Sequence, residues 1–498
     1  MKGIQDWLGH WADKSPNRTA LICGDTNAQW SYQEFFNRAQ SGANFLSEKY
    51  QIQKGDRVAY LGQNDLSVLS LFFAVKRLGA ILVPINYRLS SREVAYILSN
   101  SDPKLLVHDK EFQLVAQQSL EQVESKEKIH ALNLEDFAKS TELKKPFPEF
   151  HATENDPAMI IYTSGTTGFP KGAMISHGGL YWNAESTAAR LEIQEGDCAV
   201  TFLPLFHTGG WNVLTTPFLN RGAQIVLTQK FEADQILKLS QDHKATLLFG
   251  VPTTMGMMAR TQDFWNYNLS NIRYAIVGGE PMPIELIRTW HDKKIPIRQG
   301  YGLTEFGPNV FSLSEKDSIA KIGSIGTANT HIEVKVVGED GETLKANEIG
   351  ELYLKGPACM LGYWQNPEAT ESTIQDGWLK TGDLVRFDED GYFYVVGRKK
   401  DMYKSGGENV YPAEVEQVIS HLKWVQEVAV VGVPDERWGE VGKAYVVCSK
   451  EHYDVQSLHE HCSKNLAKFK IPKYFEWISQ LPKSGAGKVL KRELGTSR

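Results

Sequence analysis

Residues 162–172 combine the residue types that bind phosphate groups. These eleven residues contain three glycines, one serine and three threonines, with a lysine at position 171. Backbone N–H groups and hydroxyls in such a segment can surround phosphate oxygens, and Lys171 adds a positive charge. The segment is not a Walker P-loop, because Pro170 precedes the lysine and Gly172 follows it, whereas that pattern requires Gly-Lys-Ser/Thr at the start of a helix. We therefore expect a different kind of phosphate loop, placed directly after a short apolar strand.

Seven further motifs follow along the chain. They are Phe202-Leu-Pro-Leu-Phe-His207, Gly278-Gly-Glu-Pro281, Tyr301-Gly-Leu-Thr-Glu305, Thr381-Gly-Asp383, Gly397-Arg398, residues 401–416 and Pro482-Lys-Ser-Gly-Ala-Gly-Lys488. In this order, and over essentially the whole chain, the set resembles the signatures of the adenylate-forming superfamily of acyl-CoA synthetases, peptide-synthetase adenylation domains and luciferases. The resemblance implies an ATP-dependent, AMP-forming acid–thiol ligase, which makes an acyl-adenylate and pyrophosphate and then transfers the acyl group to coenzyme A.

The same resemblance implies a set of catalytic residues. ATP and the acid are both anions, so the site must screen their repulsion and stabilise charge at the α-phosphate. Lys488 matches the lysine that bridges the acid carboxylate and the α-phosphate, Thr304 contacts that phosphate, and His207 lies near the acyl carboxylate. Glu305 and Thr163 are the expected Mg²⁺ ligands, because hard oxygen atoms suit that ion.

The nucleotide and coenzyme A contacts are also implied by the resemblance. Tyr301 is expected to stack on adenine, Asp383 to accept hydrogen bonds from both ribose hydroxyls, and Arg398 to support the ribose from the other side. Residues 405–416 are expected to line the tunnel for pantetheine. The complete set of expected cofactor-binding residues is Thr163, Ser164, Gly165, Thr166, Thr167, Gly168, Lys171, Gly279, Glu280, Pro281, Tyr301, Gly302, Asp383, Arg398, Gly406, Gly407 and Glu408.

The acid itself is expected to be apolar. Trp211 matches the place of a gate aromatic in long-chain fatty-acyl-CoA synthetases, although core packing accounts for one tryptophan equally well. Residues 250–258 are expected to line the acyl pocket and contain no Arg, Lys or Asp, which favours an apolar monocarboxylate. We expect a medium- or long-chain fatty acid. The alternatives are an aryl-acid or 2-succinylbenzoate CoA ligase, an enzyme that loads an acyl carrier protein, and a non-catalytic binding relative.

The elements that position these motifs follow from the apolar pattern. Short apolar runs at residues 57–61, 80–85, 199–203, 223–226, 247–249 and 274–277 alternate with helical periodicity, as in residues 66–78 and 90–98. Such alternation predicts an α/β fold with parallel sheets covered on both faces. After about residue 312, short strands separated by Gly- and Asp-rich turns predict antiparallel sheet.

We therefore expect a large N-terminal domain of residues 1–397, built of parallel sheets with helices and ending in a small β-barrel-like subdomain at about 312–397. A mobile C-terminal α+β domain of residues 398–498 follows. The resemblance places a hinge near Lys400, where rotation separates the two half-reactions.

Composition excludes several other classes. The chain has 498 residues, 42% hydrophobic and 23% charged, with a net charge of −6, so a disordered or collagen-like chain is excluded and a dedicated nucleic-acid binder is disfavoured. No uncharged run reaches the ~18 residues of a membrane helix, and no signal-peptide core is present. We expect a cytoplasmic protein, possible as an oligomer. Five scattered cysteines without a CxxC pair indicate neither disulfides nor zinc.

Overall fold

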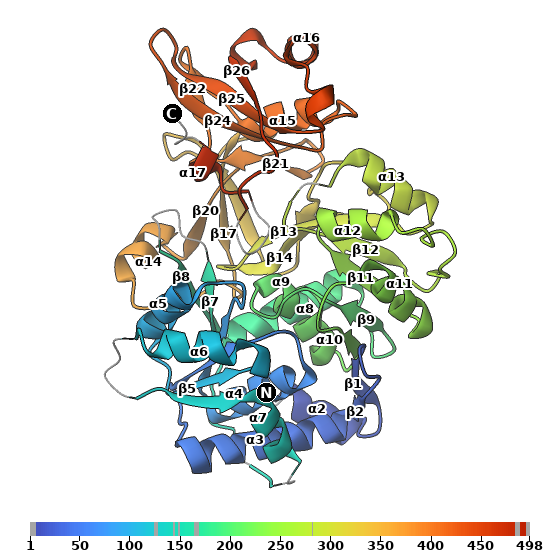
Figure 1. Cartoon of the computed structure of the whole chain (residues 1–498), viewed down its shortest axis with the longest axis vertical. Helices are drawn as coiled ribbons and strands as arrows, with labels where there is room; N and C mark the ends of the chain where they lie inside the picture. Colours follow the sequence, from blue (N-terminus) through green and yellow to red (C-terminus); the bar gives the residue numbers. More distant parts are fainter. Residues whose placement is uncertain are drawn as a thin grey trace. The chain divides into compact units, whose positions relative to one another are not determined.

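The computed structural model describes residues 6–123, 128–142, 145–147, 150–163, 169–280, 282–483 and 489–494. The chain divides into two compact units, one of Met1–Val334 with Leu354–Leu379 and the other of Lys335–Tyr353 with Lys380–Arg498. Figure 1 labels the elements of both units.

The first sheet of the larger unit has seven strands in the order β18-β8-β7-β4-β3-β5-β6. Strands β7, β4, β3, β5 and β6 are parallel, and β8 and β18 extend the sheet with antiparallel pairs. The bounds are β18 (Gly362–Tyr363), β8 (Lys171–Ser176), β7 (Pro157–Thr163), β4 (Ile81–Ile85), β3 (Arg57–Leu61), β5 (Leu105–His108) and β6 (His130–Asn133).

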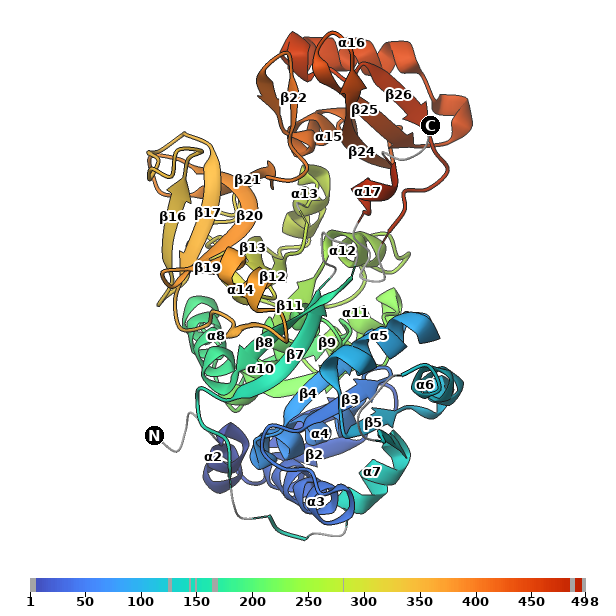
Figure 2. The same ribbon diagram turned by 90° about the vertical axis from the view of Figure 1, so that its left-hand side faces the viewer.

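Helices cover both faces of this sheet because its strands are apolar on both sides. Val58 and Tyr60 of β3 pack with α3, α4 and α7, whereas Ala59 and Leu61 pack with α5 and α6. Figure 2 shows these two groups of helices on opposite sides of the strands. Their bounds are α3 (Tyr32–Tyr50), α4 (Leu66–Leu78), α7 (Leu134–Thr141), α5 (Ser91–Ser101) and α6 (Gln113–Leu120).

Local signals explain where these helices begin and end. Asp65 caps the start of α4 by accepting from the backbone N–H of Ser67, and Gly79 ends the helix in the left-handed region at φ 69°. Ser90 and Glu93 form a capping box at the start of α5. The bounds of β3 and α4 agree with the sequence prediction to the residue.

The second sheet of the larger unit has nine strands in the order β15-β14-β13-β12-β11-β9-β10-β1-β2. Helices α11, α12 and α13 pack on one face, and α2, α8, α9 and α10 contribute to the core on the other. The bounds are β15 (Thr327–Ala328), β14 (Gly307–Ser312), β13 (Ile297–Leu303), β12 (Tyr274–Val277), β11 (Leu247–Gly250), β9 (Cys198–Thr201), β10 (Gln224–Leu227), β1 (Thr19–Cys23), β2 (Gln29–Ser31), α2 (Trp7–Lys14), α8 (His177–Leu191), α9 (Thr208–Asn212), α10 (Thr215–Asn220), α11 (Ala233–Asp242), α12 (Pro252–Ala259) and α13 (Ile284–Asp292).

Two five-stranded sheets follow along the chain. The division between the units passes through β16, β17 and β20 of the first sheet, and the second sheet packs against α15 and α16. The bounds are β16 (Glu333–Val337), β17 (Gly350–Lys355), α14 (Pro367–Thr373), β19 (Ile374–Gln375), β20 (Trp378–Phe387), β21 (Phe393–Arg398), β22 (Tyr403–Ser405), β23 (Glu408–Val410), α15 (Pro412–Ser420), β24 (Glu427–Asp435), β25 (Gly439–Val447), α16 (Val455–Asn465), β26 (Tyr474–Trp477) and α17 (Lys491–Leu494).

The predicted fold class is confirmed: parallel sheets between helices precede antiparallel strands and a C-terminal α+β arrangement. The domain boundary at residue 397 and the hinge near Lys400 remain predictions. Within the part of the chain that the structure describes, no helix is long and apolar enough to cross a membrane.

Candidate functional site

Four neighbouring strands of the nine-stranded sheet end at the same edge. Strands β9, β11, β12 and β13 are adjacent and parallel. The segments that follow their carboxyl ends carry residues of three sequence motifs and the expected pocket segment, because the loops that follow parallel strands lie on one side of the sheet. These segments contain His207 after β9, residues 251–258 after β11, Gly279 and Glu280 after β12, and Thr304 and Glu305 after β13.

His207 is the N-cap of α9. Its Nδ1 accepts a hydrogen bond from the backbone N–H of Gly209 at 3.0 Å. A neutral imidazole with Nδ1 as acceptor carries its proton on Nε2. The half-buried ring is therefore set up to donate from Nε2, which suits a residue beside a carboxylate.

Asn64 holds the segment that leads to His207, and sequence reasoning missed it. Its amide donates to the carbonyls of Leu203 at 3.2 Å and Thr228 at 3.1 Å, and its Oδ1 accepts from the N–H of Leu205 at 2.9 Å. Asn64 is buried, so two hydrogen bonds to this loop and one to Thr228, all in a dry environment, fix the loop's position. Nothing near Asn64 in the sequence indicates a partner so far along the chain.

The motif at residues 301–305 passes from β13 into a tight turn. Tyr301 lies opposite Phe311 of β14, with ring centroids 5.9 Å apart. A Cβ on Gly302 would lie 2.2 Å from the backbone of Pro308, so only glycine fits there. Thr304 is buried and Glu305 half-buried. After β12, Gly279 adopts φ 88°, and both Gly279 and Glu280 are exposed.

The flanks of the predicted phosphate loop are paired strands. Thr163 at the end of β7 lies opposite Lys171 at the start of β8, and its hydroxyl is 3.4 Å from the carbonyl of Lys171. Helix α5 holds both flanks: Asn100 accepts from the hydroxyl of Tyr162 at 2.6 Å, and the ring of Tyr96 stacks on Phe169. The predicted residues Ser164, Gly165, Thr166, Thr167, Gly168, Pro281 and Lys488 lie outside the described residues.

Tyr363 joins the turn at Glu305 to the phosphate-loop flank, a contact that no motif in the sequence indicates. Its hydroxyl donates to Oε1 of Glu305 at 2.9 Å, and the ammonium of Lys171 lies 5.3 Å from its ring centroid. Burial, followed by the charge of Glu305, raises the pKa of Tyr363. Burial and the same carboxylate also raise the pKa of the Cys359 thiol to about 12. Both groups therefore stay protonated beside the carboxylate at neutral pH.

Glu305 fits a magnesium ligand of the kind shared with substrate phosphates. Among the described residues, no group of three or more His, Cys, Asp and Glu could hold a metal by itself. Mg²⁺ is commonly held by one or two carboxylates, with water and phosphate oxygens completing the shell. A half-buried carboxylate with one oxygen already oriented by a phenol, near the flank of a phosphate loop, matches that pattern.

In the smaller unit, Asp383 and Arg398 lie opposite each other in the register of β20 and β21. Their side chains form an ion pair with Nε of Arg398 3.1 Å from Oδ1 of Asp383. Asp383 is buried, while Arg398 is half-exposed. The structure thus brings together the two residues that the resemblance assigns to the ribose.

Gly406 and Gly407 form the two-residue turn of the β22–β23 hairpin. Their φ angles are 62° and 90°, as a type I′ turn requires at both central positions. The N–H of Gly406 donates to the carbonyl of Trp438 at 2.9 Å, and a Cβ on Gly406 would lie 2.9 Å from that indole ring. Glu408 is exposed, and so is Lys404. The narrow approach at Gly406 suits a glycine beside a ligand path.

Several of the residues that the sequence interpretation places near the acyl chain are buried, and their role in the pocket stays a prediction. Trp211 is fully buried in the core with its ring 5.0 Å from that of Phe72. Met255 and Met258 also face the core, and only Met257 of this group is exposed. Packing therefore accounts for Trp211 and for two of the three methionines, because side chains on α12 point inward at helical spacing.

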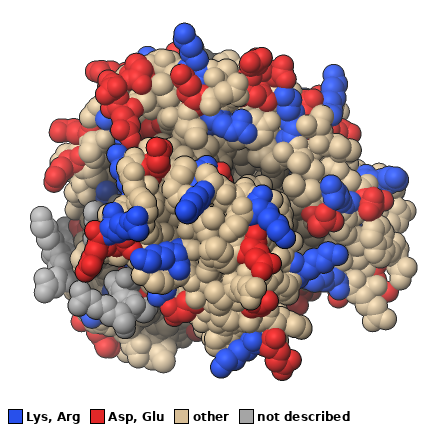
Figure 3. Space-filling model, turned by 90° about the horizontal axis from the view of Figure 1, so that it is seen from above, with Lys and Arg blue, Asp and Glu red and all other residues tan. Residues whose placement is uncertain are grey.

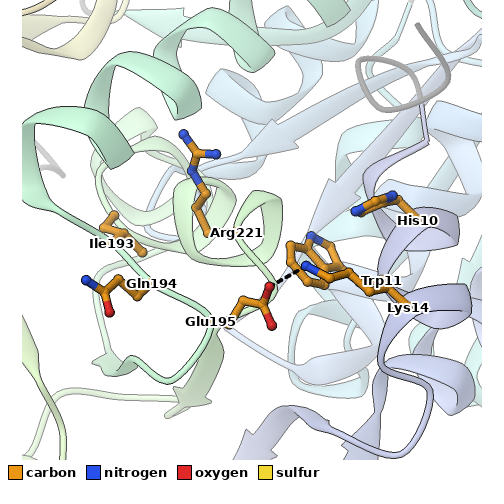
Figure 4. A pocket seen from close by; sticks show the side chains of 7 residues that line it. All are labelled: His10, Trp11, Lys14, Ile193, Gln194, Glu195 and Arg221. Atoms are coloured by element: carbon orange, nitrogen blue, oxygen red, sulfur yellow. Dashed lines mark hydrogen bonds and ion pairs between the residues drawn. The ribbon is translucent and has the colours of Figure 1, made fainter.

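A cavity of about 470 Å³ lies away from the predicted residues, between α2 and the loop before β9 (Figure 4). Its charged groups are paired: Glu195 binds Lys14 and Arg18, and Arg221 binds Glu185. On the face shown in Figure 3, basic and acidic side chains are interspersed. Neither feature supplies a cluster of uncompensated charge for a phosphate ligand.

Comparison with known families agrees with this geometry. Residues 8–364 match the AMP-binding enzyme family, and residues 414–488 match the AMP-binding enzyme C-terminal domain. The chain is 36% identical to feruloyl-CoA synthase of Amycolatopsis sp and to long-chain-fatty-acid–CoA ligase FadD13 of Mycobacterium tuberculosis. In both cases 99% of this chain and 98% of the relative are covered. It is 34% identical to 2-succinylbenzoate–CoA ligase of Bacillus licheniformis, covering 98% of this chain and 99% of that one.

Solved structures show the same architecture. The fatty acyl CoA synthetase of Mycobacterium tuberculosis superimposes with a TM-score of 0.82 at 33% identity, covering 99% of this chain and 98% of that one. The O-succinylbenzoate coenzyme A synthetase of Bacillus subtilis, in complex with ATP and magnesium ion, gives a TM-score of 0.89 at 32% identity, covering 98% of this chain and 99% of that one.

Proposed function

The chain belongs to the AMP-binding enzyme family as an adenylate-forming CoA ligase that uses ATP, Mg²⁺ and coenzyme A, and on that premise we propose that its acid substrate is an apolar monocarboxylate, foremost a medium- or long-chain fatty acid. The observation that carries the proposal is the shared edge of β9, β11, β12 and β13. It places the segment of His207, the uncharged residues 251–258 and the motif ending at Glu305 on one side of one sheet.

Residues of this edge and predicted site residues from other segments divide the work of adenylation. His207 donates from Nε2 to the acid carboxylate and so orients it towards the α-phosphate. Thr304 and Lys488 stabilise the charge that develops as the carboxylate oxygen forms its bond to phosphorus and pyrophosphate leaves. Glu305 and Thr163 hold Mg²⁺, which neutralises phosphate charge. Asp383 and Arg398 bind the ribose, and Tyr301 and Gly279 contact the adenine.

Thioester formation uses a second arrangement of the chain. After rotation about Lys400, the hairpin turn at Gly406 and Gly407 lines the pantetheine path, and the thiol displaces AMP from the acyl-adenylate. The positive φ angles of both glycines support this assignment. Glycine adopts such angles readily, and without a side chain its backbone can approach a ligand closely.

An aryl acid is the second candidate. Feruloyl-CoA synthase and 2-succinylbenzoate–CoA ligase are 36% and 34% identical to this chain, against 36% for the fatty-acid ligase FadD13. The location of Trp211 in the core also removes one argument for a fatty-acyl gate. The uncharged segment after β11 is compatible with a linear chain or an aromatic ring.

The deciding experiment measures pyrophosphate release across C2–C18 fatty acids, benzoate, ferulate and 2-succinylbenzoate, with and without coenzyme A. A dry pocket gains about 0.8 kcal/mol for each buried CH₂, so kcat/KM should rise roughly fourfold per methylene until the pocket is full. Acetate should be poor and amino acids inert. If ferulate or a benzoate exceeds every linear acid, the fatty-acid assignment is wrong while the ligase assignment stands. Transfer to a holo acyl carrier protein, but not to coenzyme A, would instead identify a loading enzyme.

A further inference from the structure

Tyr363 makes two contacts that connect separate parts of the candidate site. We propose that it is a positioning residue for adenylation: its hydroxyl orients the carboxylate of Glu305 towards Mg²⁺, and its ring holds the ammonium of Lys171 towards the phosphates. This inference rests on the proposed function, because it assigns a role within the same ATP site. Both contacts lie within the larger unit.

The backbone around Tyr363 is fixed by its pairing with strand β8. The two-residue strand β18 pairs with β8, which places Tyr363 opposite Ala173. On one side the N–H of Leu361 donates to the carbonyl of Met174 at 2.9 Å, and on the other the N–H of Trp364 donates to the carbonyl of Gly172 at 2.7 Å. The direction of the phenol is therefore set by the same strand that begins at Lys171.

Side chains strengthen this anchorage. The N–H of Tyr363 donates to the hydroxyl of Thr370 at 2.9 Å, and the indole of Trp364 donates to the carbonyl of Asn100 at 3.0 Å. A side chain whose backbone is already held in place loses little conformational entropy when it binds a neighbouring group. Tyr363 is thus held in a fixed position next to the turn that contains Glu305.

The hydrogen bond from Tyr363 gives the carboxylate of Glu305 a defined orientation. The carbonyl of Glu305 accepts from the N–H of Met360 at 2.8 Å, so the main chain of the turn is tied to the segment that precedes Tyr363. Oε1 accepts from the phenol, while Oε2 accepts no hydrogen bond from the described residues. One oxygen is fixed and the other is presented, which is the arrangement that a hydrogen-bonded metal-ligating carboxylate uses.

The ring of Tyr363 contacts the ammonium of Lys171 without forming the ion pair that a carboxylate would form. Among the described residues, the ammonium of Lys171 forms no ion pair, and the ring of Tyr363 lies 5.3 Å from it. A cation–π contact restrains a lysine without cancelling its charge. Within the described part of the chain, Lys171 is therefore not held in an ion pair that substrate phosphates would have to displace.

Tyr394 provides a matched control. Its hydroxyl donates to Asp388 at 3.3 Å, and Arg386 lies 4.4 Å from its ring centroid. The pair of contacts is the same, a carboxylate acceptor and a cation over the ring, but Tyr394 lies in β21 beside a turn that contains none of the predicted site residues. Tyr394→Phe thus loses a phenol–carboxylate bond without affecting Glu305.

The test compares Tyr363→Phe, Tyr363→Leu and Tyr394→Phe with the wild type. Calorimetry measures the Kd of a non-hydrolysable ATP analogue with Mg²⁺ and with EDTA. Tyr363→Phe should leave the metal-free Kd unchanged and weaken the Mg²⁺-dependent part of the affinity about 10-fold or more, as for other partners of metal-ligating carboxylates. The Mg²⁺ concentration for half-maximal adenylation should rise, and excess Mg²⁺ should restore the rate. Tyr363→Leu should also weaken metal-free binding, because the ring beside Lys171 is lost.

The outcomes separate this inference from the proposed function. If the wild type shows no Mg²⁺-dependent adenylation with any acid, the proposed function fails. If the wild type is active but Tyr363→Phe matches Tyr394→Phe in both Kd values and in its Mg²⁺ profile, the positioning role is wrong. Thermal unfolding of each variant identifies a loss of fold, and a loss of binding with and without Mg²⁺ in a folded Tyr363→Phe would also contradict the proposal.

Discussion

Arg398 and Asp383 face each other across β20 and β21 and form an ion pair. The next residue, Lys399, forms a similar ion pair with Glu351. Lys399 binds Glu351 at 2.8 Å, and the side-chain exposures are 59% and 9%, against 51% and 9% for Arg398 and Asp383. The two pairs are therefore alike in burial, each with a buried carboxylate and an exposed cation, and only one of them is assigned to the ribose.

This similarity allows a controlled prediction for Asp383→Asn. The change should raise the ATP KM about 10-fold or more, because hydrogen bonds to a charged group are worth about 1.5–3 kcal/mol. Glu351→Gln removes the comparable pair and should leave the KM for ATP near the wild-type value. Both variants should lose at most about 1 kcal/mol of stability, because each pair has one largely exposed partner. Equal effects on the KM would refute the ribose assignment.

Lys488→Ala is expected to separate the half-reactions. Adenylate formation should fall by on the order of 10²-fold or more, as for loss of a main electrostatic donor. Thioester formation from pre-made acyl-adenylate should change much less. Rapid-quench measurement of each step tests this, and equal damage to both steps would contradict a rotation about Lys400.

Gly406→Leu is expected to act on the other half-reaction. A side chain at φ 62° is strained and meets the ring of Trp438, so the turn must move where pantetheine is proposed to pass. Gly391→Leu is a suitable control, since Gly391 has φ 80° in an open turn with nothing within 4 Å. Thioester formation should fall for Gly406→Leu only, with adenylation near normal. A similar loss for Gly391→Leu would point to backbone strain alone.

Trp211 is expected to behave as a core residue. Trp211→Ala should cost about 3–5 kcal/mol of unfolding free energy, the usual range for a buried aromatic. Trp211→Phe should cost much less, because the indole Nε1 is buried with no hydrogen-bond partner among the described residues. Urea unfolding measures both. If Trp211→Phe is stable yet alters the chain-length profile, the gate interpretation regains support.

The buried histidine His177 should make stability depend on pH. Burial, followed by the charge of Lys76, lowers its pKa to about 3. Below pH 6.5 His177 is protonated in the unfolded chain but stays neutral in the folded chain. The free energy of unfolding therefore falls between about pH 6.5 and 3, by up to about 1.4 kcal/mol per pH unit. His177→Phe should flatten this slope, and His421→Phe at the surface should not. Urea unfolding at pH 7.5, 6 and 5 tests it, and parallel slopes would contradict it.

Lys76, whose charge acts on His177, adds a second pH range in which stability falls as the pH falls. Burial lowers the pKa of Lys76 to about 7, so stability from this group is lost as pH falls from about 10.5 to 7. Lys76 lies over the ring of Trp7 at 4.0 Å. Lys76→Met should keep the packing and remove this dependence, which unfolding measured at pH 7.5 and 9.5 would show.

The sequence by itself determined the local elements and the chemistry of the motifs. Strand β3 and helix α4 follow from apolar spacing, Asp65 and Gly79, because caps and periodicity act over a few residues. The phosphate-loop composition, the carboxylate of Glu305 and the paired glycines 406 and 407 are likewise visible in short segments. Such features depend on neighbours along the chain.

Only the tertiary structure decided which distant residues support them. Tyr363 is 58 residues from Glu305, and Asn64 is 141 residues from Leu205. Both contacts join segments of two different sheets, and a linear pattern does not specify how those sheets meet. The same applies to Trp211, whose motif suggested a gate but whose helix α9 turns its ring against Phe72. Long-range packing, rather than local propensity, sets these positions, because the free energy of burying a side chain depends on surfaces contributed by the whole fold.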